Sequence, residues 1–275
     1  MIDKEAIKEM TKGDATAAAC EAMDAAYALR GPVALPNDFV LHDLEKFYDR
    51  RRRQRGMMCT ASVKDFAAYA LAQREDGAAV FVSPKPVQAV AVLNLGTPDA
   101  PGHCDHCAVW TPEPTAAYRA LSAAVDQELS QQALAEWLED WAPCMSCEAD
   151  GADMPVARAV ASVRSITIEN LRRVASDVQA LSAQRTAFES VAARSGQAEQ
   201  IPQRMAFTCA PFSGLQERTF ALRLSILTGG DKPRMKLRIV LHEQHLEEIA
   251  GAAADLVRAA IGTTAPVWAG TFKAS

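Results

Sequence analysis

Four of the seven cysteines form two Cys-x-x-Cys pairs, Cys104/Cys107 and Cys144/Cys147. Such a pair places two thiolates on one side of a tight turn, and two pairs supply the four sulfur ligands of tetrahedral Zn²⁺. The intervening segment, residues 108–143, is longer than the roughly 15–20 residues usual in such sites, but two antiparallel helices would return the chain to its start. A site closed by four cysteines is structural, so the sequence predicts structural zinc. Separate thiols and a reversible redox pair are the alternatives.

A second candidate for chemistry overlaps the first pair, in the loop Gly-His-Cys-Asp-His at 102–106. Two histidines and a carboxylate could hold a metal ion or supply a general base. The catalytic candidates are therefore His103, Asp105 and His106. His42 and Asp43, from the preceding segment, could assist them. The alternative is a loop whose polar side chains bond to nearby backbone, as aspartate often does in turns.

One dense basic run precedes both, and it consists of Arg50, Arg51, Arg52, Arg53 and Arg55. Arginine binds phosphate bidentately, so these are the predicted nucleic-acid-binding residues. A solvated loop or a contact with another subunit is the alternative. Because the net charge is −5, any nucleic-acid contact must be local. Arg223, Lys236 and Arg238 share one face of a predicted hairpin and allow the same two interpretations.

Other catalytic signatures are weak or missing. His242-Glu243-Gln244-His245 resembles a zinc-protease helix, but its histidines are three residues apart and not four, so a surface or capping role is expected. The sequence has no Walker loop, no Gly-x-Gly-x-x-Gly and no Gly-x-Ser-x-Gly elbow. Nucleotide-driven and α/β-hydrolase chemistry therefore lack support.

The elements that would position these residues indicate an α+β fold, with antiparallel strands joined by hairpins and flanked by helices. The clearest is a hairpin in which residues 220–226 and 235–241 alternate apolar and polar side chains around a turn at 228–231. Helices are expected at 3–30, 62–73, 115–125, 130–141, 167–181 and 243–261. Further strands are expected at 56–60, 78–83, 87–95, 108–111, 184–194 and 205–209.

The polar, glycine-containing segment 144–154 is the best candidate for a domain boundary. It would separate residues 1–148, a helical arm plus the His/Cys loop, from residues 149–275; one continuous domain is the alternative. An apolar fraction of 49% suffices for a core. The charged N-terminus has no apolar signal segment, and no run is long enough to span a bilayer. We therefore expect a cytoplasmic protein with reduced cysteines and no membrane contact.

An ordered set of short motifs runs through residues 33–140. They are Val33-Ala34-Leu35-Pro36, His42-Asp43-Leu44-Glu45, Asp65-Phe66-x-x-Tyr69, Ala91-Val92-Leu93-Asn94, Pro101-Gly102-His103-x-Asp105-His106, Pro114-Thr115-x-x-Tyr118 and Leu134-Ala135-Glu136-Trp137-Leu138-Glu139-Asp140. In this order they resemble the YfdQ-like family of phage and prophage proteins, a domain of unknown function. The likeness continues through Pro211-Phe212-Ser213-Gly214 and the C-terminal hairpin, so it covers most of the chain.

The resemblance implies a phage or prophage origin and a bacterial cytoplasmic setting, but no activity. It also implies that the Gly-His-x-Asp-His element is shared by the family, whereas the cysteine pairs are peculiar to this chain. The expected function is that of a non-enzymatic binding or self-assembling protein, working as a homo-oligomer. The alternatives are an accessory protein of phage DNA metabolism or counter-defence that contacts nucleic acid or a host protein, and a metal-dependent enzyme using the His103 loop.

Overall fold

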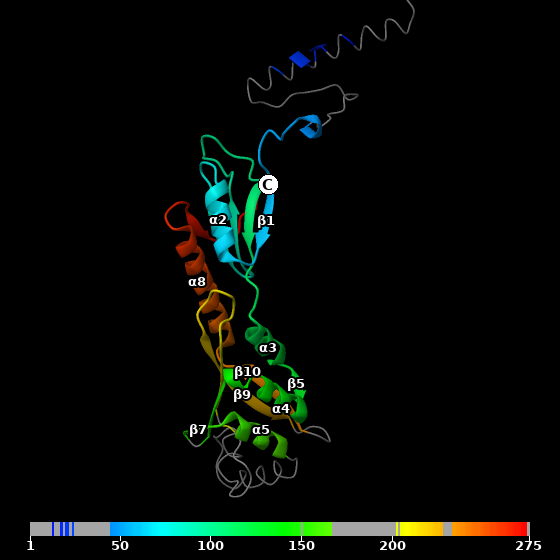
Figure 1. Ribbon diagram of the computed structural model, residues 1–275, viewed down its shortest axis with the longest axis vertical. Helices are drawn as coiled ribbons and strands as arrows, with labels where there is room; N and C mark the ends of the chain where they lie inside the picture. Colours follow the sequence, from blue (N-terminus) through cyan, green and yellow to red (C-terminus); the bar gives the residue numbers. More distant parts are fainter. Residues whose placement is uncertain are drawn as a thin grey trace, which may run out of the picture. The chain divides into compact units, whose positions relative to one another are not determined.

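The structure is a computed structural model, and it describes residues 45–149, 151–166, 202, 204–227 and 233–273, with six further positions between 13 and 24. The chain divides into two units, Met1–Gln54 and Arg55–Ser275. The second unit contains two mostly antiparallel sheets with helices packed on them, so the α+β prediction is confirmed (Figure 1). The elements expected at 167–181, 184–194 and 228–231, and most of the helix expected at 3–30, lie outside the described residues.

A five-stranded sheet carries the His/Cys loop. Its strands are β1 (Gly56–Thr60), β2 (Ala79–Pro84), β3 (Val87–Val92), β4 (His106–Trp110) and β11 (Val267–Ala269), in the order β1-β4-β3-β2-β11. β2, β3 and β4 pair antiparallel, whereas β1 and β11 form the edges by pairing parallel to β4 and β2. Helices α2 (Val63–Gln73) and α8 (His242–Ile261) pack on one face of this sheet.

The second sheet has six antiparallel strands. Its strands are β5 (Glu128–Ser130), β6 (Met145–Ala149), β7 (Ala152–Met154), β8 (Arg204–Cys209), β9 (Arg218–Leu227) and β10 (Arg234–Ile239), in the order β5-β10-β9-β8-β6-β7. Its apolar face packs against α3 (Ala116–Ala124), α4 (Gln131–Asp140) and α5 (Val156–Ser165). Residues on both sides of position 148 therefore contribute strands to one sheet.

Helix α8 contributes to both hydrophobic cores. Ile249, in its second turn, packs with the core of the six-stranded sheet. Ala253, Val257 and Ile261, at the spacing of one helix face, pack with the core of the five-stranded sheet. The helix ends at Gly262, whose φ of 65° is favourable for glycine and whose N–H donates to the Arg258 carbonyl.

The predicted hairpin is confirmed as β9 and β10, in which Leu224 pairs with Leu237 and Arg223 with Arg238. The segment 144–154, in which the sequence places a domain boundary, contains β6 and β7, and the boundary stays a prediction. Met145, Cys147 and Ala149 of β6 are buried, whereas Ser146 is exposed. A two-residue period with small or sulfur-containing apolar residues is a weak signal in sequence, yet it is sufficient beside an existing sheet.

Candidate functional site

His106 is the buried centre of the motif loop. It is the first residue of β4, and its side chain lies on the same face as Ala108 and Trp110, toward α2. Only 2% of the surface of His106 is exposed to solvent. Its Nε2 lies 3.1 Å from the hydroxyl of Tyr69 on α2, and the two rings meet edge to face. Its Nδ1 has no hydrogen-bond partner among the described residues, so one nitrogen of a buried imidazole is unsatisfied.

Asn94 holds the end of the loop against the start of β4. Its side-chain amide donates to Asp105 Oδ1 at 2.9 Å, and its Oδ1 accepts from the His106 backbone N–H at 3.1 Å. Its backbone carbonyl accepts from the N–H of Cys104. A Cβ at Gly102 would lie only 1.9 Å from this same carbonyl oxygen. The glycine and the aspartate of the motif are therefore accounted for by close backbone packing.

The two candidate histidines occupy different environments. His103 is exposed, whereas His106 is buried against α2. Within the described ranges, no three side chains of His, Cys, Asp or Glu lie together as metal ligands. The assisting residues His42 and Asp43 fall outside those ranges. The catalytic role of His103, Asp105 and His106 stays a prediction, and the bonds of Asp105 favour the loop-bracing alternative.

The first cysteine pair forms a turn at the start of β4. Cys104 has a φ of 56°, in the left-handed region, and the thiol of Cys107 lies 3.7 Å from the Cys104 carbonyl oxygen. Burial raises the pKa of the Cys107 thiol, and the neighbouring Cys104 and Asp105 raise it further. A thiol in these surroundings is a weaker nucleophile at neutral pH than a free cysteine.

The second cysteine pair belongs to the other sheet. Cys147 is buried within β6, and this burial raises the pKa of its thiol to about 11. Cys209 on β8 has its pKa raised to about 11, chiefly by burial and next by Cys144. The thiol that influences Cys209 is thus Cys144, a proximity that sequence spacing does not reveal. Zinc binding by the four cysteines stays a prediction, with each pair assigned to a separate sheet.

The basic run follows the 3-10 helix η1 (Glu45–Phe47). The backbone N–H of Arg52 donates to Glu45 Oε1, and its guanidinium lies 5.5 Å from the centre of the Tyr48 ring. Arg50 and Arg51 are exposed. Arg50 to Arg53 belong to the first unit and Arg55 to the second. Nucleic-acid binding by this run stays a prediction.

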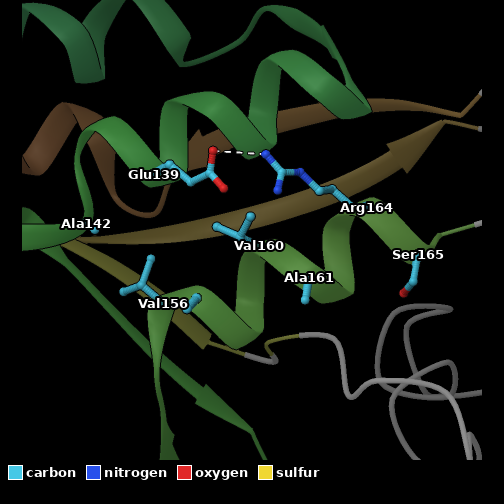
Figure 2. A pocket seen from close by; sticks show the side chains of 8 residues that line it. Glu139, Ala142, Val156, Val160, Ala161, Arg164 and Ser165 are labelled. Atoms are coloured by element: carbon cyan, nitrogen blue, oxygen red, sulfur yellow. Dashed lines mark hydrogen bonds and ion pairs between the residues drawn. The ribbon is translucent and has the colours of Figure 1, made fainter.

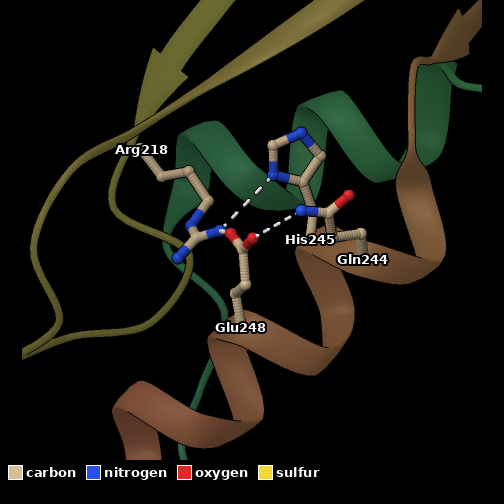
Figure 3. A network of polar contacts seen from close by, with 4 residues as sticks. All are labelled: Arg218, Gln244, His245 and Glu248. Atoms are coloured by element: carbon tan, nitrogen blue, oxygen red, sulfur yellow. Dashed lines mark hydrogen bonds and ion pairs between the residues drawn. The ribbon is translucent and has the colours of Figure 1, made fainter.

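The second histidine of the His-Glu-Gln-His sequence joins a polar network between β9 and α8 (Figure 3). The guanidinium of Arg218 is paired with Glu248 and lies 3.4 Å from Nδ1 of His245. Gln244 donates to the other oxygen of Glu248 at 3.0 Å. Burial lowers the pKa of His245, and the charge of Arg218 lowers it further. A neutral imidazole can accept a hydrogen bond from arginine, and this contact braces α8 against β9.

A hollow of about 550 Å³ lies between α4 and α5 (Figure 2). Val156, Val160 and small alanines line it, and an ion pair of 2.9 Å joins Glu139 to Arg164 beside it. This lining offers an apolar surface, and its charged groups are already paired with each other. The hollow therefore shows no arrangement that suits acid–base or nucleophilic chemistry.

The family model described as "Uncharacterized conserved protein (DUF2303)" matches residues 4–272, and the chain belongs to this family. No curated protein and no solved structure matches the chain. Among the described helices, none combines the length and the apolar character needed to cross a membrane. Tyr69 and Asn94 were present in the motifs that suggested a family, but only the structure shows their contacts with His106.

Proposed function

We propose that this member of the DUF2303 family is a non-enzymatic binding protein that self-associates through the face of its five-stranded sheet opposite α2 and α8. The observation that carries the proposal is a line of apolar side chains across every strand on the face opposite α2 and α8. We call this line the apolar row; it consists of Cys59, Val109, Val90, Phe81 and Trp268.

The apolar row follows from the register of the sheet. Cys59 pairs with Val109, Val109 with Val90, Val90 with Phe81, and Phe81 with Trp268. Neighbouring residues of each strand, such as Val80 and Ala108, point to the opposite face and enter the core. Both faces of this sheet are apolar, and helices bury one of them. On the other face Val109 is buried, whereas Cys59 and Trp268 at the ends of the apolar row are exposed, and these ends favour a second apolar surface.

Exposure at the two ends of this face supports a docking role. Trp268 on edge strand β11 is 58% exposed, and Met57 on edge strand β1 is 67% exposed. Between them Phe81 stacks on Phe272, with ring centres 5.0 Å apart. Large exposed apolar side chains, and tryptophan above all, are enriched where protein surfaces meet.

A second copy of the chain is the occupant that the charges of this face favour. None of the outward-facing residues of the five strands is charged. In a twofold dimer each surface meets its own copy, so a face without charge avoids repulsion between like groups. Two such sheets would pack about 10 Å apart, as in a β-sandwich.

The experiment that tests the proposal replaces exposed residues only, so that folding is spared. Wild-type protein should have twice the 29.6 kDa mass of one chain in light scattering at micromolar concentration. The double substitution Trp268→Ser with Met57→Ser should raise the dimer dissociation constant by about 30-fold or more, because truncation of an interface tryptophan is among the most costly changes at protein interfaces. If wild-type protein is still a monomer at about 100 μM, the proposal is contradicted.

Leu227→Ser is the matched control, because Leu227 is also an exposed apolar residue but lies on β9 of the other sheet. It should leave the mass unchanged. Equal loss of the dimer in both variants would indicate a general effect of lost hydrophobicity and would count against this face.

The proposal also covers the origin of the protein and the compartment in which it acts. The resemblance to YfdQ-like proteins supports a phage or prophage origin and a site of action in the bacterial cytoplasm, where a host protein is the alternative partner. The non-enzymatic part is supported by Asp105 and His106, because Asp105 accepts a hydrogen bond from Asn94 and the His106 ring contacts the Tyr69 hydroxyl of α2.

A further inference from the structure

We propose that the exposed face of the six-stranded sheet binds the phosphate backbone of single-stranded nucleic acid. This face is the one turned away from α3, α4 and α5, and we call it the arginine face. Its basic residues are Arg204 on β8, Arg223 on β9, and Arg234, Lys236 and Arg238 on β10. This site is separate from the run at Arg50 to Arg55 and goes beyond the proposed self-association.

Two arginines stand directly opposite each other on this face. Arg223 and Arg238 are register partners on β9 and β10, and both are exposed. Side chains so paired have Cβ atoms about 5 Å apart, and like charges in this arrangement are destabilising. Within the described ranges neither arginine has an ion pair or hydrogen bond, so no carboxylate in that part of the chain relieves their repulsion. An anion bound between the two guanidinium groups would relieve this repulsion.

The positive row continues onto β8. Because Met205 pairs with Leu222, the register places Arg204 beside Arg223. Arg204 is 84% exposed along its side chain and only loosely paired, 3.7 Å from Glu148. Strands lie about 4.8 Å apart, so the three arginines form a line about 10 Å long. Such a line can contact successive phosphates of one extended strand.

The rest of the arginine face is flat. The outward residues next to the row are small or hydroxylic, with Ala221 opposite Ala206 and Thr219 opposite Thr208. The two threonine hydroxyls are 2.9 Å apart. Among the described helices, α3, α4 and α5 pack on the opposite face of this sheet and cannot enter a duplex groove from the arginine face, so an extended single strand fits it better. The described strands place no aromatic residue on this face, which predicts contact with phosphates and not stacking on bases.

The chemistry of arginine favours phosphate as the ligand. A guanidinium fork binds two phosphate oxygens at once. A second copy of the same face would oppose arginine with arginine, so this face cannot serve as the self-association surface. Lys236 is paired with Asp126 at 3.2 Å and stands opposite Glu128 in the register. Glu148 and Asp153 lie on β6 and β7, the last two strands at the other end of the sheet. These carboxylates limit the proposed site to the arginines of β8, β9 and β10.

The test uses full-length protein and a fluorescent 20-nucleotide oligothymidine, with binding followed by anisotropy at 50–200 mM salt. Wild-type protein should bind with an affinity that falls as salt rises. The double substitution Arg223→Ser with Arg238→Ser should weaken binding at 0.1 M salt by about tenfold to thirtyfold and reduce the salt slope by about 1.4, the value for two phosphates. Removing the opposed charges should leave thermal stability equal or higher.

Arg119→Ser with Arg158→Ser is the matched control, since it removes the same charge from two exposed arginines on α3 and α5, which pack on the opposite face of this sheet. Absent binding at 50 mM salt, or loss of binding in the control alone, overturns the proposal. Polyglutamate that competes as well as the oligothymidine also overturns it, in favour of an acidic protein partner. The dimer mass of the Arg223/Arg238 variant is measured alongside, so failure of this site is distinguishable from failure of the proposed self-association.

Discussion

Backbone packing at Gly102 is the tightest requirement of any single position in the motif loop. The carbonyl of Asn94 lies where a side chain would begin, and Gly96 and Gly77 make similarly close approaches nearby. The loop therefore depends on glycine for space, and this explains its sequence without invoking a reaction.

Gly102→Ala should destabilise the protein by about 1–3 kcal/mol, because either the loop or Asn94 must move to admit a methyl group. Gly251→Ala is the control within one chain: Gly251 lies in α8 with nothing near its Cβ position, so alanine should stabilise by about 0.5–1 kcal/mol. Urea unfolding of the three proteins measures both changes. A neutral Gly102→Ala substitution would contradict the described loop.

The individual cysteines should differ in the reactivity of their thiols. Cys20 and Cys59 are exposed, whereas Cys147 and Cys209 are buried with pKa values of about 11. At pH 8 the thiolate fraction of the buried pair is on the order of one in a thousand. Ellman's reagent should therefore label the exposed pair within seconds and the buried pair only on unfolding. Fast labelling of Cys147 in native protein would refute this order.

Zinc can be detected in the same experiment. If zinc held Cys104, Cys107, Cys144 and Cys147, a chelator would release metal and speed the labelling of all four together. Elemental analysis before and after chelation supplies the independent readout, and protein without metal would leave the predicted zinc site without support.

At the scale of elements, the contact between β9 and α8 makes stability depend on pH. The pKa of His245 is lowered by burial, by Arg218 and by His242, and is raised by Glu248. The net folded pKa lies below the ordinary value of 6.5, so the unfolded chain binds more protons in that window. The stabilisation is complete above pH 6.5 and is lost as the pH falls through the folded pKa.

The melting temperature of wild-type protein should therefore fall between pH 7 and pH 5.5, and His245→Gln should reduce this dependence. His242→Gln, three residues earlier on the same helix, is the control and should retain most of it. Below this range, protonation of Glu248 adds a further loss, because Gln244 and Arg218 lower its pKa. Parallel melting curves for wild type and His245→Gln would contradict the described network.

Sequence patterns predicted the elements with strong periodicity. The hairpin of β9 and β10, the helix caps at Ser62 and Ser130, and the strand at 56–60 are confirmed. Short strands such as β6, β7 and β11 were missed, because a few residues carry little periodic signal and pair only beside a preformed sheet. The parallel edges β1 and β11 also depend on partners far away in sequence, which local patterns do not indicate.

The candidate site likewise has features that the sequence predicted and features that it did not. From residue type alone, the sequence identified His106, Asp105 and the cysteines as groups that could bind a metal or take part in catalysis. Their burial, the bracing by Asn94, and the proximity of Cys144 to Cys209 all depend on strand register. The opposition of Arg223 to Arg238 could be anticipated only as a shared face, since the pairing itself requires the hairpin register.

At the scale of the whole molecule, the two sheets present outward faces of opposite character. The five-stranded sheet offers an uncharged apolar surface, whereas the six-stranded sheet offers arginines over a floor of alanine and threonine. Each face suits one partner and disfavours the other, because apolar surface attracts no phosphate and opposed arginines repel a copy of themselves. Under the two proposals, one chain would associate with itself through one sheet and bind a polyanion through the other.

The C-terminal position of α8 and β11 also has a consequence for synthesis on the ribosome. Val267 to Ala269 pair with Val80 to Val82, and α8 completes the core against β2 and β3. Strands made early thus wait for almost the entire chain before their sheet is closed, and contacts so distant in sequence form slowly. During that interval the nascent sheet lacks α8 and β11 and exposes the apolar surface that they later cover, so we expect the incomplete chain to be prone to aggregation.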